Sequence, residues 1–192
     1  PEIPGREQFT RRSFHSADWD HSFDLRGKRA AVIGTGASAI QFVPAIAERA
    51  ASLTVFQRSP AYILPRPDRP HSRLERSLFK WMPGAMRLHR LAIYLKYEVR
   101  VLAFTRLKGL MRPLGEKPFL KLLDRQISSA DLRKKMTPDY PVGCKRVLLS
   151  SDYLAAFDRP NVRLETDGIR RITPTGIETR DGRHHEVDAI IY

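Results

Sequence analysis

The feature that most constrains this fold is a short apolar run that breaks into glycines and then resumes with helical spacing. Residues 29–33 read Arg-Ala-Ala-Val-Ile, and such a run is typical of a parallel strand that is covered on both faces. Residues 34–39 read Gly-Thr-Gly-Ala-Ser-Ala, which fits the pattern G-x-G-x-x-A, and residues 37–50 have helical spacing. The sequence therefore predicts a strand, a tight turn and a helix in succession.

The small residues of this turn indicate what it could bind. Gly34 permits the tight turn, Gly36 lets a pyrophosphate approach the backbone, and Ala39 allows the helix to pack closely on the strand. Free N–H groups at the start of the helix supply an anion site. A glycine-rich turn without a ligand is the alternative that this pattern alone leaves open. The cofactor-binding residues expected here are Gly34, Thr35, Gly36, Ala37, Ser38 and Gln41.

The next strand indicates which nucleotide the turn would prefer. Residues 52–56 form a short apolar run, and Gln57, Arg58 and Ser59 follow at its carboxyl end, roughly 20 residues after the glycine pattern. A site for NAD places Asp or Glu at this point to hold the ribose 2′-hydroxyl, whereas this chain offers a guanidinium and a hydroxyl. We therefore expect NADP, with Arg58 and Ser59 at its 2′-phosphate.

Composition bounds the class of protein. The chain has 192 residues, of which 42% are hydrophobic, so it can bury a sizeable core. Its single cysteine, Cys144, excludes an internal disulfide and suits a reducing compartment, so we expect a cytoplasmic protein. The longest apolar run in the middle of the chain, residues 91–95, is far shorter than the ~20 residues that a transmembrane helix needs.

The net charge of +13 is concentrated in the middle of the chain. Residues 58–146 carry 21 Lys and Arg against 7 Asp and Glu, whereas the remainder carries 13 against 14. Such a field could attract nucleic acid, an anionic membrane or a phosphorylated cofactor; a solvated helical face, or a surface paired with an acidic partner domain, is the alternative. RNA-binding aromatic patterns and a helix-turn-helix pattern are not present, so we expect no nucleic-acid partner, and a weak peripheral membrane contact stays open.

The positions of proline and glycine divide the chain into two parts. Residues 1–28 read as a linker, and residues 29–192 as a three-layer α/β domain of the Rossmann type with a parallel sheet. A proline-rich, irregular loop at 60–70 leads into a helical insertion over about 68–140. The helices expected in the insertion cover 86–111, 118–126 and 130–135.

The last third of the chain reads as a short helix at 152–158 among short strands. His184 and His185 would point to opposite faces of an extended segment, so we expect no metal site there. The strands expected in this part cover 147–149, 161–165, 168–172, 176–179 and 187–192.

Further motifs flank the glycine pattern. Phe9, His15 and Trp19 form F-x-x-x-x-x-H-x-x-x-W, residues 55–60 read Val-Phe-Gln-Arg-Ser-Pro, and residues 143–146 read Gly-Cys-Lys-Arg. In this order the motifs resemble the class B flavoprotein monooxygenases, the group of the Baeyer–Villiger and flavin-containing monooxygenases, over nearly the whole chain. A lone histidine between aromatic residues is otherwise more often structural than catalytic.

Two positions depart from the fingerprint of that family, F-x-G-x-x-x-H-x-x-x-W-P. Arg11 stands where the fingerprint has glycine, and Asp20 stands where it has proline. An arginine disfavours a left-handed turn at position 11, and the Baeyer–Villiger branch is therefore not assigned from the fingerprint alone.

The resemblance implies a cofactor pair and a reaction. NADPH would reduce FAD, and the reduced flavin would take up O₂ as a peroxyflavin that transfers one oxygen atom to a ketone or aldehyde, or to a nitrogen or sulfur nucleophile. Phe9, His15 and Trp19 would be interdomain hinge residues. Lys145 would help to bind the 2′-phosphate, and Arg146 would reach the flavin and nicotinamide as the catalytic residue.

The FAD motif of the family, a second G-x-G-x-x-G, is not found in these 192 residues. We therefore expect a segment of a longer FAD- and NADPH-dependent monooxygenase that is inactive without the flanking FAD domain. A non-catalytic NADP-binding or interaction module is the alternative, and a basic binder of nucleic acid or a membrane surface is a less favoured one.

Overall fold

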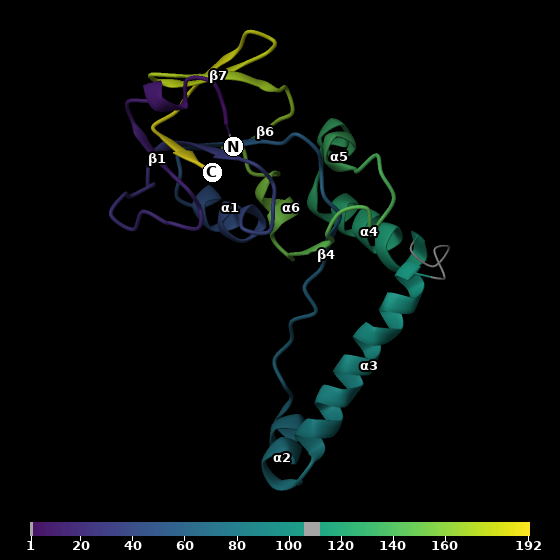
Figure 1. Cartoon of the computed structure of the whole chain (residues 1–192). Coiled ribbons are helices and arrows are strands. Elements are labelled where there is room, and N and C mark those ends of the chain that lie inside the picture. The colour runs from purple at the N-terminus through teal and green to yellow at the C-terminus, as the bar shows by residue number, and fades with distance from the viewer. Residues whose placement is uncertain (1, 106–111) are drawn as a thin grey trace.

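A five-stranded parallel sheet forms the middle of the body of the molecule, from which a helical hairpin projects (Figure 1). The computed structural model describes residues 2–105 and 112–192, and the strand order of the sheet is β1-β10-β2-β3-β6. The predicted strands at 29–33 and 52–56 are confirmed, and those at 161–165 and 187–192 are somewhat shorter than expected. The strands are β1 (Arg12–Phe14), β2 (Arg29–Ile33), β3 (Ser52–Phe56), β6 (Val162–Glu165) and β10 (Ala189–Ile191).

Strand β2 lies inside the sheet and is covered on both faces. Its side chains alternate between two cores, because successive residues of a strand point to opposite faces. Ala30 and Val32 pack in the core on one face, and Ala31 packs in the core on the other. All three are at most 1% exposed, which confirms the prediction from the continuous apolar run.

The sheet is the middle of three layers. Helices α1 (Ala39–Ala47) and α6 (Tyr153–Ala156) lie on one face, and a three-stranded antiparallel sheet lies on the other (Figure 1). An α/β fold with a parallel sheet is thus confirmed, although one outer layer consists of strands. The antiparallel strands are β7 (Ile169–Thr173), β8 (Gly176–Thr179) and β9 (His184–Glu186).

The segment expected to be a linker is packed against this body. A 3-10 helix, η1 (Arg6–Gln8), precedes β1, and Phe9 is buried beside Ile172 and Ile177. Gly5 has φ 78°, and a Cβ atom there would lie 2.2 Å from the carbonyl oxygen of Ile172. The carbonyl of Pro4 accepts a hydrogen bond from the N–H of Ile172 at 2.8 Å. Only glycine fits so close to the antiparallel sheet. The N-terminal segment is therefore packed in a defined position on the domain.

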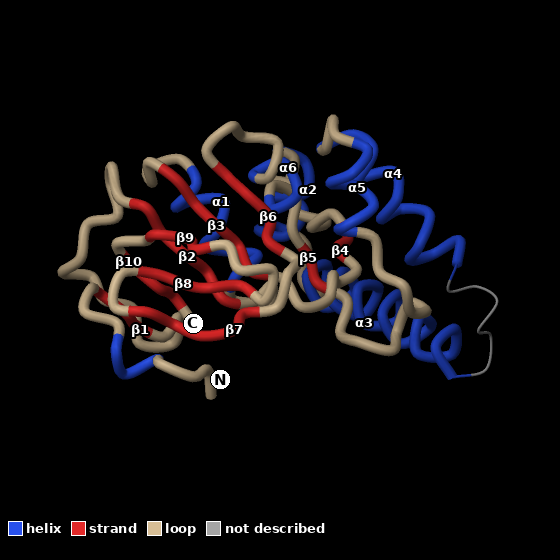
Figure 2. The backbone as a smooth tube through the Cα atoms, turned by 90° about the horizontal axis from the view of Figure 1, so that it is seen from above, coloured by secondary structure: helices blue, strands red, loops and turns tan. Residues whose placement is uncertain are grey.

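The helical insertion divides into two parts with different surroundings. Helices α4 (Lys117–Gln126) and α5 (Ala130–Met136) pack on the body, where Phe119, Leu123 and Met136 are buried. Helices α2 (Arg73–Trp81) and α3 (Ala85–Thr105) form a hairpin that projects away from it (Figure 1). The predicted helices at 118–126 and 130–135 are confirmed. Figure 2 shows the strands of the body on one side and helices α3, α4 and α5 on the other.

Helix α2 is a helix that the sequence analysis did not predict. Its signal is Ser72-x-x-Glu75, a capping box in which the Ser72 hydroxyl accepts from the Glu75 N–H and the Glu75 carboxylate accepts from the Ser72 N–H. The helix predicted at 86–111 is confirmed to Thr105, and residues 106–111 lie outside the described part of the chain. A π-helix, η3 (Arg112–Glu116), leads into α4. Within the described ranges, no helix combines the length and apolar character that a membrane-spanning segment requires.

The insertion enters and leaves the body at one place, which we call the neck. Strand β4 (Ile63–Leu64) runs parallel to β5 (Leu148–Leu149) there. The N–H of Leu148 donates to the carbonyl of Tyr62 at 2.9 Å, and the hydroxyl of Tyr62 donates to the carbonyl of Tyr140 at 2.9 Å. The neck therefore brings residue 60 and residue 145 to the same end of the body.

Candidate functional site

The candidate site lies along the edge where the parallel strands end. Phe14, Ile191, Val32 and Val55 are register partners across β1, β10, β2 and β3. The residues that follow each strand therefore line one edge of the sheet. In open α/β sheets, ligands bind outside the carboxyl ends of the strands.

The glycine turn follows β2 at the middle of this edge. Gly34 has φ 111°, a left-handed conformation that favours glycine, and its N–H donates to the carbonyl of Phe56 at 3.0 Å. Among the described residues, no carbonyl or side chain accepts from the N–H groups of residues 35–38. A Cβ atom at Gly36 would meet nothing within 4 Å, so the turn has open space beside it. The start of α1 therefore presents N–H donors that have no acceptor among the described residues.

The other residues expected at this turn have defined positions. Ala39 is 6% exposed where α1 packs on the sheet, as the G-x-G-x-x-A pattern predicts. Ser38 is exposed, and its side chain does not cap the helix. The Gln41 amide donates to the carbonyl of Ala37 at 2.8 Å, which holds the turn to the first turn of the helix.

Charged and hydroxyl groups gather at the end of β3. Arg58 is exposed, and Ser59 accepts a hydrogen bond from the ammonium group of Lys145 at 2.8 Å. The two partners are 86 positions apart in the sequence, so the neck is what joins them. The structure thus places Lys145 beside Ser59, three residues after the end of β3.

The position of Lys145 depends on an aromatic ring that the sequence analysis did not select. Its Nζ atom lies 4.4 Å from the centroid of the Tyr140 ring. The Tyr140 hydroxyl donates to the carbonyl of Pro60 at 2.6 Å, and burial raises the pKa of this hydroxyl, so it stays protonated. Pro138-Asp139-Tyr140-Pro141 gives no local signal for this contact, because the ring meets its partner only in the folded chain.

Arg146 follows Lys145 but is not joined to the same group. Residues 142–145 form a turn, with Gly143 at φ 99°, so the two cations do not alternate along an extended strand. Arg146 is exposed, and the ion pairs among the described residues do not include it. Cys144 is exposed and free.

The three fingerprint residues differ in exposure. Phe9 is buried, and the Trp19 ring packs on Phe14 and on Phe42 of α1 with ring centroids 5.2 Å apart in both pairs. His15 lies between them on the surface, where its Nδ1 atom accepts from the N–H of Ala17 at 3.0 Å. The structure therefore fixes Phe9 and Trp19 by packing and leaves the outer edge of the His15 ring open.

Both departures from the fingerprint take part in ion pairs. Arg11 donates to Glu186 at 2.9 Å and to Asp188 at 2.7 Å, and Asp20 pairs with Arg12. No described residue other than glycine has a positive φ, so position 11 is not a left-handed turn.

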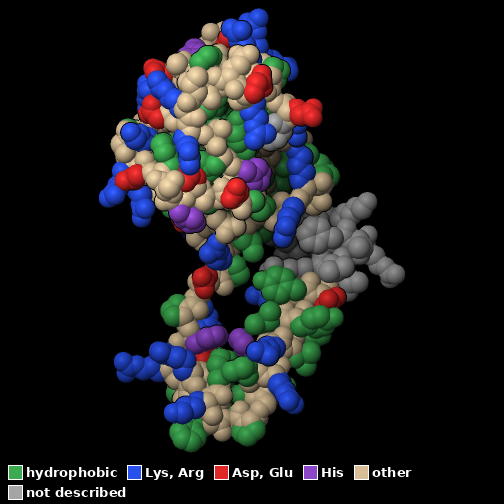
Figure 3. All heavy atoms as spheres, turned by 60° about the vertical axis from the view of Figure 1, so that its left-hand side comes forward, with side chains coloured by type: hydrophobic (Ala, Val, Ile, Leu, Met, Phe, Trp, Pro, Cys, Tyr) green, Lys and Arg blue, Asp and Glu red, His purple; other side chains and the backbone are tan. Residues whose placement is uncertain are grey.

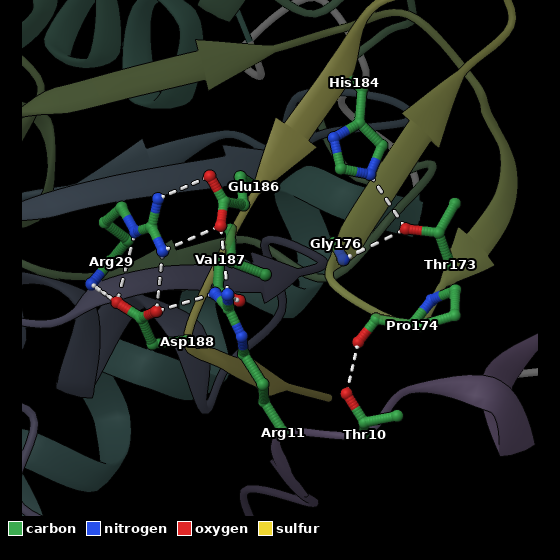
Figure 4. Close-up of polar contacts among 10 residues, drawn as sticks. All are labelled: Thr10, Arg11, Arg29, Thr173, Pro174, Gly176, His184, Glu186, Val187 and Asp188. Carbon is green, nitrogen blue, oxygen red and sulfur yellow. Dashed lines mark hydrogen bonds and ion pairs between the residues drawn. The ribbon is translucent and has the colours of Figure 1, made fainter.

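Figure 4 shows the cluster to which Arg11 belongs. Arg29 donates from its backbone and guanidinium to Asp188, and its guanidinium also pairs with Glu186. Hydrogen bonds from Arg29 lower the pKa of Asp188 to about 2. The cluster ties β1, β10 and β2 together at the ends opposite to the candidate site.

The paired histidines point in different directions, as predicted. The Nε2 atom of His184 lies 2.8 Å from the Thr173 hydroxyl (Figure 4), whereas His185 packs its ring against Phe56 and lies 3.4 Å from Glu165. Burial lowers the pKa of His185. In the described part of the chain, no group of three or more His, Cys, Asp or Glu side chains could hold a metal ion.

The fold and the site together show an α/β protein with an open glycine turn, and with the exposed Arg58 and Lys145 near the carboxyl ends of the parallel strands. No protein-family model matches the chain. A Baeyer-Villiger monooxygenase of Pseudomonas aeruginosa is 47% identical over 192 residues, which cover all of this chain and 36% of that protein. A Baeyer-Villiger monooxygenase of Streptomyces coelicolor is 43% identical over all of this chain and 37% of that protein.

A solved structure agrees with these relatives. An oxidized steroid monooxygenase bound to NADP matches all of this chain and 43% of its own with a TM-score of 0.80 at 27% identity. The chain thus spans a little over a third of the length of the curated relatives that it matches. It belongs, as a segment, to the flavin-dependent monooxygenase family of the Baeyer–Villiger type.

Proposed function

We propose that this chain is the NADPH-binding segment of a flavin-dependent Baeyer–Villiger monooxygenase. The observation that carries the proposal is the contact of Lys145 with Ser59 beside Arg58, at the end of the strand next to the glycine turn. Two cations and a hydroxyl at this point suit a phosphate on the adenosine ribose. A carboxylate, which would suit the bare hydroxyls of NAD, does not follow β3.

The donor set of the turn fits a dinucleotide. The N–H groups of residues 35–38 have no acceptor among the described residues, and the space beside Gly36 is open. A pyrophosphate could therefore accept from the turn without displacing an existing hydrogen bond. Binding of NADP by the related steroid monooxygenase supports this choice of cofactor.

Arg58 and Lys145 would divide the work at the 2′-phosphate. Arg58 is exposed, and a guanidinium can meet two phosphate oxygens at once. Lys145 is held by Ser59 and the ring of Tyr140, so it offers a fixed charge that needs little ordering on binding.

Arg146 is proposed as the residue that faces the reaction. It is exposed, and it forms no ion pair with a described residue. A guanidinium at this position would stabilise negative charge that develops on a bound group. The flavin would supply the oxygen transfer to a ketone or aldehyde, and a segment of the polypeptide outside this chain would hold it.

The test is nucleotide preference, measured by calorimetric titration of the chain with NADPH and NADH. We expect NADPH to bind more tightly, and Arg58→Ala to weaken NADPH binding by roughly tenfold or more, because a charge-assisted hydrogen bond contributes about 1.5–3 kcal/mol. Arg87→Ala removes the same charge from helix α3, far from the site, and is the matched control. Equal affinity of the parent chain for both nucleotides would contradict the proposal.

A further inference from the structure

We infer that His15 donates a hydrogen bond to the nicotinamide half of a dinucleotide bound at the glycine turn. The inference rests on the proposed function, because it needs a dinucleotide whose adenosine end lies at Arg58 and Lys145. His15 lies on the side of β2 opposite to β3, and the family resemblance implied only a hinge role for it. The inference adds a cofactor contact at this position.

The direction of the dinucleotide follows from the strand order. The side chains that we expect to bind the 2′-phosphate follow β3, and the glycine turn follows β2. The adenosine half therefore lies on the β3 side of the turn. The second half must then continue over β10 and β1, which are the next strands on the other side of β2. His15 comes directly after β1, two strand spacings or about 10 Å from β2, which is comparable with the length of one nucleotide.

The hydrogen bonding of the ring decides its role. The Nδ1 atom accepts from the backbone N–H of Ala17 at 3.0 Å, and an amide N–H can only donate. The neutral ring must therefore carry its proton on Nε2. Because His15 is exposed, this Nε2–H is available as a donor. The carboxamide oxygen and the ribose hydroxyls of the nicotinamide half are acceptors of the matching kind.

The segment that carries the ring is already fixed. Phe14 accepts from the N–H of Tyr192 at 3.0 Å, and the N–H of Ser16 donates to the carbonyl of Tyr192 at 2.8 Å. At the other end of β1, Arg11 is held by Glu186 and Asp188 (Figure 4). Little conformational entropy is therefore lost when the ring binds a ligand.

The experiment compares two probes on one chain. NADPH contains both halves of the dinucleotide, whereas adenosine 2′,5′-bisphosphate contains only the adenosine half. We expect His15→Ala to weaken NADPH binding about three- to tenfold, the usual effect of one hydrogen bond, and to leave the affinity for adenosine 2′,5′-bisphosphate unchanged. His15→Gln, which keeps a donor near the position of Nε2, should recover most of the NADPH affinity.

A control and three outcomes make the result decisive. His21→Ala removes another exposed histidine from the same segment and should change neither affinity. Equal weakening of both probes by His15→Ala would indicate a structural role and overturn the inference, and so would an unchanged affinity for NADPH. A parent chain that binds neither probe would overturn the proposed function itself.

Discussion

The three-layer body and the α2–α3 hairpin differ in the exposure of their apolar side chains. In the body, Leu53 and Val43 are fully buried between layers. In the hairpin, Leu74 is 83% exposed, Trp81 is 75% exposed, and α2 has no buried residue. Figure 3 shows hydrophobic and basic side chains side by side on the surface of the hairpin.

The difference teaches that the two regions are held by different kinds of interaction. The body depends on contacts between residues far apart in the sequence, such as the parallel ladder of β2 and β10. The hairpin depends on contacts between residues close in the sequence, including the capping box of α2 and the edge-to-face and tilted contacts among the rings of His71, Phe79 and His89. Amphipathic sequences therefore form helices in both regions. In the body the apolar faces of the helices pack against the sheet, whereas in the hairpin much of the apolar surface stays exposed.

The largest expected effect is the removal of a buried side chain from the body. Leu53→Ala should lower the free energy of unfolding by about 2–5 kcal/mol, because it leaves a cavity between the sheet and the helices. Leu88→Ala, at a position on α3 that is 64% exposed, is the matched control and should change it by less than about 0.5 kcal/mol. Urea unfolding measures both. Similar losses for the two variants would mean that the hairpin is packed as the body is.

A smaller effect is expected at the charge cluster of the body. The pKa of Asp188 in the folded chain, about 2, lies below its ordinary value of 3.8, so its ion pairs stabilise the fold above pH 4 and are lost as the pH falls toward 2. Asp188→Asn should lower the free energy of unfolding at pH 7 by about 1–2 kcal/mol, after allowance for its partial exposure.

The pH profile of unfolding tests this assignment. The parent should lose more stability than Asp188→Asn between pH 4 and pH 2, and the two curves should therefore converge in acid. Asp24→Asn is the control, because its ion pair with Arg26 is exposed and should contribute little. Parallel curves for the parent and Asp188→Asn would refute the role of this carboxylate.

The smallest effect is expected in the hairpin, where a substitution should change the local stability of α2 and leave global unfolding unchanged. Ser72→Ala removes the cap of α2 and should cost about 1 kcal/mol of local helix stability. Hydrogen exchange should become severalfold faster over residues 73–81, whereas the midpoint of global unfolding should not move. Ser77→Ala, in the middle of α2, is the control. A matching shift in global unfolding would show that hairpin and body unfold together.

Much of the body could be predicted because its signals are local. The apolar run of β2 and the turn at Gly34 each lie within a few residues, and the structure confirms both. Strand β1 could not be predicted in this way. Its sequence, Arg-Ser-Phe, has no strand pattern, and its ladder partner β10 begins at Ala189, far along the chain.

The candidate site shows the same limit. Arg58 and Ser59 were expected from their distance to the glycine turn, but Lys145 was expected only from a family resemblance. No spacing rule could have found the bond between Lys145 and Ser59, because it closes across the whole insertion. The roles of these residues, and that of Arg146, stay predictions, and the titration of Arg58→Ala addresses the first of them.

The neck between β4 and β5 gives this architecture a tolerance for change in length. The entropic cost of closing a flexible loop rises only with the logarithm of its length, by about 0.6 kcal/mol for each doubling. Because the parallel pair of Ile63 and Leu148 closes the insertion at its base, residues beyond the neck can be added or removed at little cost. The distance between Ser59 and Lys145 would not change. One sheet edge can thus be combined with insertions of many sizes, so that the inserted helices can diverge while the contact between Lys145 and Ser59 persists.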